Sequence, residues 1–257
     1  MKTRLYTLAL ALTLATAHAV VAGDLWLGVR GGPSLPQLTG GGDEITRDYS
    51  SILAPNFGLV ADYFFTKHWS LQVEAVYSVQ GGERDGMQPI TQTLPGMPPM
   101  PPGQYLYADF DNKSILEYLE IPILAKYHGE LSGRWRYFLE GGPYVGFLLS
   151  AEQRTRGVSQ IYFDKYRTPV INPGTGLPLP PVSFHADTDV KDELNTVNAG
   201  IVAGLGLAYM LTDRQQIFLD VRGQYGFITL QKDTSSDGES HAGAIVFSLG
   251  YMLRFGD

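Results

Sequence analysis

The 257-residue chain contains no cysteine, and only 18% of its residues are charged. The absence of cysteine excludes disulfides, zinc-thiolate sites and thiol catalysis. Beyond the N-terminus there is no long apolar run, which excludes a helical membrane bundle because each span needs about 20 such residues. The formal net charge is −7, so nucleic acid is not an expected partner.

The N-terminus has the pattern of a secretory leader. Lys2 and Arg4 precede a short apolar stretch, and the small-x-small sequence Ala-His-Ala follows at residues 17–19. This combination is typical of a signal peptide and is too short for a membrane anchor. We therefore predict a signal peptide over residues 1–22, cleaved near residue 19 or 22, and an exported domain over residues 23–257.

The exported domain is dominated by a period-two pattern, in which apolar residues alternate with polar or very small ones. This alternation over stretches of about ten residues is typical of strands with one face on lipid and the other on a lumen. No long helical pattern competes with it. The sequence predicts eight strands, near residues 24–33, 54–65, 69–80, 115–128, 134–149, 196–210, 215–229 and 242–255.

The connections between these strands are alternately long and short. Short polar turns are expected at residues 66–68, 129–133 and 212–214, and the other connections are much longer. A barrel inserted in one direction has this asymmetry, because its periplasmic turns are tight and its extracellular loops can grow. The predicted fold is all-β: an eight-stranded antiparallel up-and-down transmembrane barrel with short periplasmic turns and long extracellular loops.

The side chains indicate which face of the barrel points outward. One face carries bulky aliphatic and aromatic residues, such as Leu71, Val73 and Tyr77, and the other carries glycines and charges. A soluble lipocalin-type barrel would turn the bulky face inward. The interior of eight strands is too narrow for so many large side chains, so we expect the bulky face to contact lipid. Aromatic residues also concentrate near both ends of the strands, as in interfacial girdles.

Charged residues on the opposite face predict an ion-pair network that closes the lumen. Buried charges are tolerated when they are paired and hydrogen-bonded. Five acids and five bases are expected there, in balance: Arg30, Asp62, Glu74, Glu120, Lys126, Arg136, Glu140, Asp220, Arg222 and Arg254. Pro122 and Pro143 fall inside predicted strands, and we expect a β-bulge at each.

The same charges allow a catalytic interpretation, with paired carboxylates such as Glu74 and Glu120 acting on a substrate. Structural networks produce the same pattern, and no nucleophile, metal-ligand or nucleotide motif accompanies these carboxylates. The sequence therefore predicts no catalytic residue, no cofactor and no metal. For a lipid-modifying hydrolase or acyltransferase, the available neighbours are Glu239, Ser240 and His241.

Several strand segments resemble the PorT-type outer-membrane β-barrel family of Gram-negative bacteria. The most specific are LEIP, within residues 118–127, and GGPYVGF, within residues 137–149; LWLGVRGG, FLDVRGQYG and FSLGYMLRF also match. The resemblance covers the strands but not the loops. It implies a small barrel in the outer membrane, and a few members are linked to secretion machinery. Gly223 departs from the family's usual residue before Gln-Tyr-Gly.

The long connections hold the remaining candidate sites. Residues 81–114 include a Pro- and Met-rich stretch from Leu94 to Gly103, and residues 150–195 combine five prolines with Tyr162, Phe163 and Tyr166. Both are interpreted as possible sites for an extracellular ligand or protein, or as exposed spacers. The acidic stretch at residues 233–239 does not have the spacing of a calcium loop.

These observations predict a non-enzymatic, monomeric outer-membrane barrel whose surface loops carry any recognition role. Its expected partners are outer-membrane lipid, lipopolysaccharide and, during insertion, the outer-membrane assembly machinery. The alternatives are a barrel-embedded lipid-modifying enzyme, a narrow diffusion channel and an accessory component of a secretion system.

Overall fold

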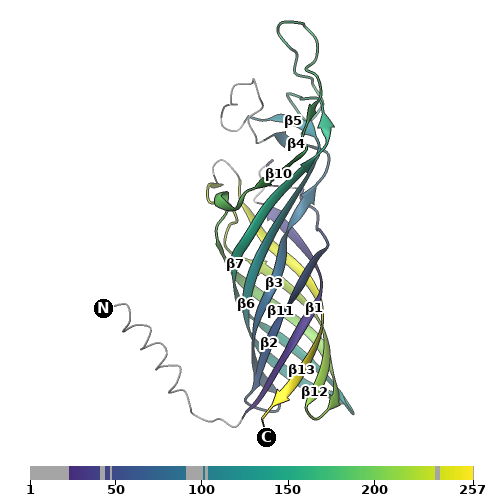
Figure 1. Ribbon diagram of the computed structural model, residues 1–257, viewed down its shortest axis with the longest axis vertical. Helices are drawn as coiled ribbons and strands as arrows, with labels where there is room; N and C mark the ends of the chain where they lie inside the picture. The colour runs from purple at the N-terminus through teal and green to yellow at the C-terminus, as the bar shows by residue number, and fades with distance from the viewer. Residues whose placement is uncertain are drawn as a thin grey trace, which may run out of the picture.

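The structure, a computed structural model, is a closed antiparallel β-barrel (Figure 1). It describes residues 23–40, 44–46, 48–90, 101, 104–234 and 238–256. The predicted signal peptide, most of the Pro- and Met-rich stretch and part of the acidic stretch lie outside these residues. No helix in the described part of the chain is both long and apolar enough to cross a membrane.

Eight long strands form the wall of the barrel, as predicted. Their order around the ring is β1, β2, β3, β6, β7, β11, β12, β13 and back to β1, and each neighbouring pair is antiparallel. The strands are β1 (Asp24–Gly40), β2 (Ala54–Phe64), β3 (Trp69–Arg84), β6 (Asp111–Ser132), β7 (Trp135–Arg156), β11 (Val197–Thr212), β12 (Gln215–Gly226) and β13 (Ser240–Phe255). Pairing of β1 with β13 closes the ring, so the barrel wall has no free edge strand.

The alternation of side chains follows the predicted orientation. Leu59 is 64% exposed on the outside of β2, whereas Asp62 on the same strand is fully buried. Leu205, Leu219 and Leu249 are likewise exposed on their strands. Because successive residues of a strand point to opposite faces, this pattern places the apolar set outside and the charged set in the lumen.

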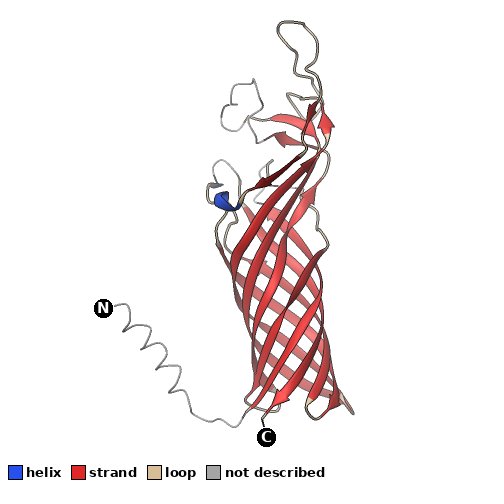
Figure 2. Cartoon of the chain, in the orientation of Figure 1, coloured by secondary structure: helices blue, strands red, loops and turns tan. Residues whose placement is uncertain are grey.

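The two ends of the barrel differ as expected. Tight turns join β2 to β3, β6 to β7 and β11 to β12 at one end, and the long connections gather at the other (Figures 1 and 2). We call these the short-turn end and the long-loop end. Strands β6 and β7, with 22 residues each, are the longest strands and rise beyond the rest of the wall toward the long loops (Figure 1).

Four long loops, numbered in chain order, join β1 to β2, β3 to β6, β7 to β11 and β12 to β13. They have structure of their own. They contain the hairpins β4 (Met87–Ile90) with β5 (Leu106–Asp109) and β8 (Val158–Ser159) with β9 (Val182–Ser183). The short strand β10 (Ala186–Asp189) extends the sheet beside β7, and the 3₁₀ helix η1 (Lys191–Glu193) follows it. These elements place part of the third loop close to the open end of the barrel (Figure 1).

The predicted bulges at the two prolines are wrong. Glu120 pairs with Gly146 and Ala125 pairs with Gly141, so β6 and β7 keep one register on both sides of Pro122 and Pro143. The missing proline N–H leaves a few positions of the ladder unpaired, which does not require an extra residue in either strand. Register shifts between these strands occur instead at Glu117/Tyr118 and Glu130/Ser132.

Candidate functional site

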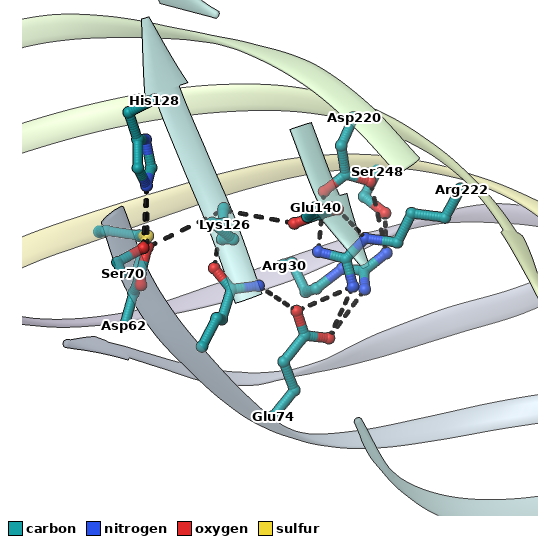
Figure 3. A network of polar contacts seen from close by, with 12 residues as sticks. Arg30, Asp62, Ser70, Glu74, Lys126, His128, Glu140, Asp220, Arg222 and Ser248 are labelled. Carbon is teal, nitrogen blue, oxygen red and sulfur yellow. Dashed lines mark hydrogen bonds and ion pairs between the residues drawn. The ribbon is translucent and has the colours of Figure 1, made fainter. Parts of the chain in front are cut away.

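The centre of the lumen is organised around the carboxylate of Glu74 on β3 (Figure 3). Arg30 Nη1 lies 2.8 Å from Glu74 Oε2, and Arg222 Nη1 lies 2.8 Å from Glu74 Oε1. These three side chains come from β1, β3 and β12, and all are buried. Because the two arginines approach the carboxylate from different strands, they link distant parts of the wall across the barrel.

Arg222 and Arg30 also hold two further acids. Arg222 Nε lies 2.5 Å from Glu140 Oε1, and Arg222 Nη2 lies 3.2 Å from Asp220 Oδ2. Arg30 Nη2 lies 3.5 Å from Asp220 Oδ1 and donates a hydrogen bond to Ser248. Each guanidinium therefore contacts more than one carboxylate, which is possible because the planar group carries five N–H donors.

Lys126 extends the network toward the short-turn end. Its ammonium donates a 2.8 Å hydrogen bond to Gln72 Oε1, and it lies 3.4 Å from Glu140 Oε2 and 3.8 Å from Asp62 Oδ2. The ammonium also lies 3.9 Å from the centroid of the Phe138 ring, which is a favourable cation–π distance. Beyond Asp62, His128 Nε2 contacts the hydroxyl of Ser70 at 2.9 Å.

The ten predicted lumen charges do not form a single balanced network. Seven of them are joined by the contacts above: Arg30, Asp62, Glu74, Lys126, Glu140, Asp220 and Arg222. This group contains four acids and three bases, so the expected five-to-five balance does not hold within it. The remaining three residues lie elsewhere.

Glu120 occupies a separate polar layer. Its carboxylate accepts hydrogen bonds from Gln80 Nε2 at 3.0 Å and from Gln224 Nε2 at 3.2 Å. Both partners are neutral amides, and Glu120 is only 3% exposed. Amide donors satisfy the oxygens of a buried carboxyl group without supplying a countercharge. Glu120 lies diagonally across the β3–β6 pair from Glu74, but its hydrogen-bond partners are neutral amides whereas those of Glu74 are arginines.

Arg136 and Arg254 lie at the short-turn mouth of the barrel. They line a pocket of about 520 Å³ together with Lys67, Glu130 and Asp213. Arg254 Nη2 lies 2.7 Å from Asp24 Oδ1, and this pair is partly exposed. Both arginines therefore line this pocket at the short-turn mouth and are not joined to the central network by the contacts described above.

An apolar layer in the short-turn half of the lumen was not expected from the sequence. It consists of Trp26, Val60, Phe138, Ala208, Phe218 and Met252, all buried. The large rings fit because glycines face them: a Cβ on Gly206 would lie 2.2 Å from the Phe138 ring, and a Cβ on Gly250 would lie 2.1 Å from the Phe218 ring. The signal available in the sequence was that these aromatics occupy the same alternating positions as the charges.

A second apolar layer, the outer apolar layer, closes the long-loop half of the lumen. Its buried members are Leu38, Leu116, Tyr118, Leu148, Ala151, Leu194, Leu230 and Ala242, and Tyr49 and Val190 pack against it. Leu194 and Leu230 come from the third and fourth loops, so the loops complete this layer. The charged network thus lies within a lumen that has an apolar layer toward each end.

The residues proposed for a lipid-modifying enzyme do not assemble into a nucleophile and base. Ser240 is buried, and its hydroxyl contacts the side-chain amide of Gln231 at 2.7 Å. His241 follows it on β13, where successive side chains point to opposite faces. The His241 ring instead lies near Tyr225, and its Nε2 is 3.5 Å from Glu239 Oε1. Among the described residues, no group of three or more His, Asp or Glu side chains is placed to hold a metal ion.

Comparison with known families agrees with this architecture. The model of the outer membrane protein β-barrel domain matches residues 19–231, which is more than half of the chain. The chain belongs to this family. As a member of the outer membrane protein β-barrel domain family, it is placed in the outer membrane, and its exposed apolar strand positions face lipid. The short-turn end is then periplasmic and the long-loop end extracellular.

Solved structures with a similar fold include three other barrels. OprG from Pseudomonas aeruginosa has a TM-score of 0.43 and 10% identity, covering 91% of this chain and 97% of that chain. The neisserial surface protein NspA has a TM-score of 0.38 and 11% identity, covering 90% and 97%. The outer membrane protease OmpT from Escherichia coli has a TM-score of 0.44 and 9% identity, covering 90% and 97%. No curated protein matches the sequence.

Proposed function

We propose that this outer-membrane barrel is a non-enzymatic protein with a closed lumen, which serves as a rigid support for recognition by its extracellular loops. The observation that carries the proposal is the buried network of Arg30, Glu74 and Arg222 in the middle of the lumen. Opening a path through it would separate three buried charges from their partners. This is a costly change in a low-dielectric interior.

The apolar layers add to this barrier. An ion crossing the lumen would have to pass Phe138 and Phe218 near the periplasmic end, and Leu116 and Leu194 near the extracellular end. Buried apolar side chains disfavour the passage of an ion, because they offer no polar group to replace the water that it would lose. The arrangement therefore supports a closed scaffold better than the alternative of a narrow diffusion channel.

Conductance in planar lipid bilayers tests the closed lumen. The purified full chain should insert without producing stable conductance steps. A variant that lacks residues 160–181, the projecting part of the third loop, should also produce no conductance steps. The charged network and the apolar layer around Phe138 and Phe218 lie in the barrel lumen and remain in this variant. A stable conductance of the full chain would contradict the proposal. Conductance that appears only in the shortened variant would show that the loop, and not the lumen, blocks the path.

The absence of an enzymatic role is tested by lipid analysis. Cells that produce the protein and cells that produce the Ser240→Ala variant should have the same lipid A acylation pattern as cells without the protein. The geometry supports this expectation because the Ser240 hydroxyl contacts Gln231 and does not face His241. A change in acylation that depends on Ser240 would favour the lipid-modifying alternative.

We further propose that the chain is of the PorT type within its family, on the basis of the LEIP and GGPYVGF segments. Export by a cleaved signal peptide, insertion by the outer-membrane assembly machinery, contact with lipopolysaccharide and a monomeric state complete the proposal. The pairing of β1 with β13 supports a monomer, since no strand edge of the barrel wall is left for a second copy. The exposed apolar residues on the outside of the strands are covered by lipid in this proposal.

A further inference from the structure

A small pocket lies at the extracellular mouth, above the outer apolar layer. Its volume is about 140 Å³. The first loop, the end of the third loop and the fourth loop meet the rim of the barrel there. The lining residues are Leu38, Ile45, Thr46, Tyr49, Ser114, Leu116, Gln153, Val190, Glu193, Leu194, Leu230, Gln231 and Ser240.

Six of the thirteen lining residues are aliphatic, and the other seven carry polar groups. Leu38, Leu116, Leu194 and Leu230 belong to the outer apolar layer, which separates the pocket from the charged network. An apolar cavity of about 150 Å³ is large enough to bind benzene. The pocket therefore has the size and surface to take a single ring or a short hydrocarbon chain, which would be retained at the mouth and not passed through the barrel.

One polar group in this pocket has no partner among the residues that the structure describes. Thr46 is only 3% exposed, yet its hydroxyl Oγ1 makes no hydrogen bond to another described group. A buried hydroxyl without a partner is unfavourable, and a bound molecule with a hydrogen-bonding group would satisfy it. This unpartnered hydroxyl is an observation independent of the pocket's volume and apolar lining.

The charges around the pocket restrict the ligand further. Glu193 is the charged residue of the lining, and it is exposed. The neighbouring Tyr49 is neutral at physiological pH, because desolvation raises the pKa of its phenol above the ordinary value of 10.0. Arg84 lies close by, where its guanidinium donates hydrogen bonds to the Glu44 and Ile45 carbonyls and interacts with the Tyr49 phenol. Among the described residues, the two opposite charges near the pocket give it no excess charge that would favour an ion.

We propose that this extracellular mouth pocket binds a small neutral molecule, consisting of one ring or a short hydrocarbon chain with a single hydrogen-bonding group that contacts Thr46. The inference rests on the proposed recognition role of the loops and names a ligand class for it. The ligand's apolar part lies against Leu116, Leu194 and Leu230, and its polar group completes the hydrogen bonding of the Thr46 hydroxyl.

Phenol is a suitable probe, with toluene as the analogue lacking the hydroxyl and benzoate as the anionic analogue. The full chain in lipid nanodiscs, with labelled Leu and Val methyl groups, is titrated and followed by NMR. We expect saturable shifts for phenol at the methyl groups of Leu116, Val190, Leu194 and Leu230, and none for benzoate. Shifts spread evenly over the lipid-facing leucines, without saturation at these four residues, would overturn the proposal.

Two substitutions locate the binding. Ser114→Leu fills the pocket from β6 and should abolish the saturable shifts. Ser150→Leu makes the same change at an exposed position outside the pocket and should leave them intact. Phenol binding that survives Ser114→Leu would overturn the proposed site.

Thr46→Val tests the assigned hydrogen bond. It should weaken phenol binding by about fivefold, the effect of one hydrogen bond, and leave toluene binding unchanged. Unchanged phenol affinity in this variant would overturn the role of Thr46. The result is separate from the closed-lumen proposal, because a non-conducting barrel that binds no phenol disproves only the pocket, whereas a conducting barrel disproves the closed lumen.

Discussion

The barrel lumen and the extracellular parts of β3, β6 and β7, which we call the extracellular extension, both contain ion pairs, but in very different surroundings. In the lumen, the side chains of Arg222 and Glu74 are 2% and 0% exposed. In the extension, Lys113 and Glu83 lie 3.6 Å apart with exposures of 41% and 51%, and Arg154 pairs with Glu152 in similarly exposed positions. The residue types are alike, and the solvent around them is what differs.

This difference determines what the pairs can do. A buried charge that loses its partner keeps its desolvation cost, whereas an exposed charge is rehydrated when its partner is removed. We therefore infer that the lumen pairs fix the strand arrangement and keep the barrel closed. The pairs of the extension contribute little to stability, which leaves that surface free to vary.

The largest effect is expected from Glu74→Ala. Removing this carboxylate leaves Arg30 and Arg222 buried without their shared partner, and should lower the free energy of unfolding by about 3–5 kcal/mol. The measurement is a denaturant titration of the refolded protein in lipid vesicles. The matched control is Glu83→Ala, which removes the same side chain from an exposed pair. Equal losses in the two variants would abolish the distinction between the two regions.

The next largest effect is expected at Val73, which precedes Glu74 on β3 and points to the opposite face of the strand. Val73 lies on the lipid-facing side of β3, so Val73→Arg should cost about 2–4 kcal/mol if the position is near the bilayer midplane. Leu177→Arg introduces the same charge at a 65% exposed apolar residue of the third loop and should have little effect. The same vesicle titration compares them, and a similar cost for both would refute the assignment of β3 to the bilayer.

A small effect is expected for the exposed pair of the extension. Lys113→Ala should change the free energy of unfolding by less than about 1 kcal/mol, because exposed pairs are screened by water and salt. Repeating the titration at high salt should reduce even this difference. A loss of several kcal/mol would mean that the extension is as tightly coupled to the barrel as the lumen is.

The smallest effect is local and depends on pH. Asp164 in the third loop accepts hydrogen bonds from the Thr168 side chain and from the Thr168 and Tyr166 amides, and these bonds lower its pKa below the ordinary value of 3.8. The stabilisation of this turn is therefore present above that value and is lost as the pH falls through the lowered pKa. Protection of the Tyr166 and Thr168 amides from hydrogen exchange, relative to the intrinsic rate at each pH, should fall at acid pH in the wild type. Asp164→Asn should show no such acid step, and a persistent step would assign it to another group.

The sequence was sufficient to predict most of the barrel wall, because one face of each strand contacts lipid and the other faces the lumen. Alternation around residues such as Leu59 and Asp62 predicted which side chains face lipid, and the spacing of turns predicted eight strands. The same reasoning failed at Pro122 and Pro143, where the ladder lost pairs but kept its register. The alternation of apolar and polar residues indicates which face of the strand a residue occupies. It does not indicate how the hydrogen bonding between two strands adjusts to a proline, which lacks an N–H donor.

The candidate site was only partly predictable for a similar reason. Glu120 and Glu74 share the inward face, yet one contacts neutral amides and the other contacts arginines. Phe138 and Phe218 fit in the lumen only because Gly206 and Gly250 face them from neighbouring strands. Such partners depend on strand stagger around the ring, which no single segment specifies.

The class of the fold, the orientation of each strand face and the end of the barrel at which loops accumulate can all be predicted from the sequence, because they follow from local periodicity and connection length. The closed ring establishes which lumen charges meet, where apolar layers lie in the lumen and how three loops enclose a pocket at its mouth. Those features arise when residues far apart in the chain are brought to the same height in the closed ring, and height in the ring is set by the register of every strand pair together.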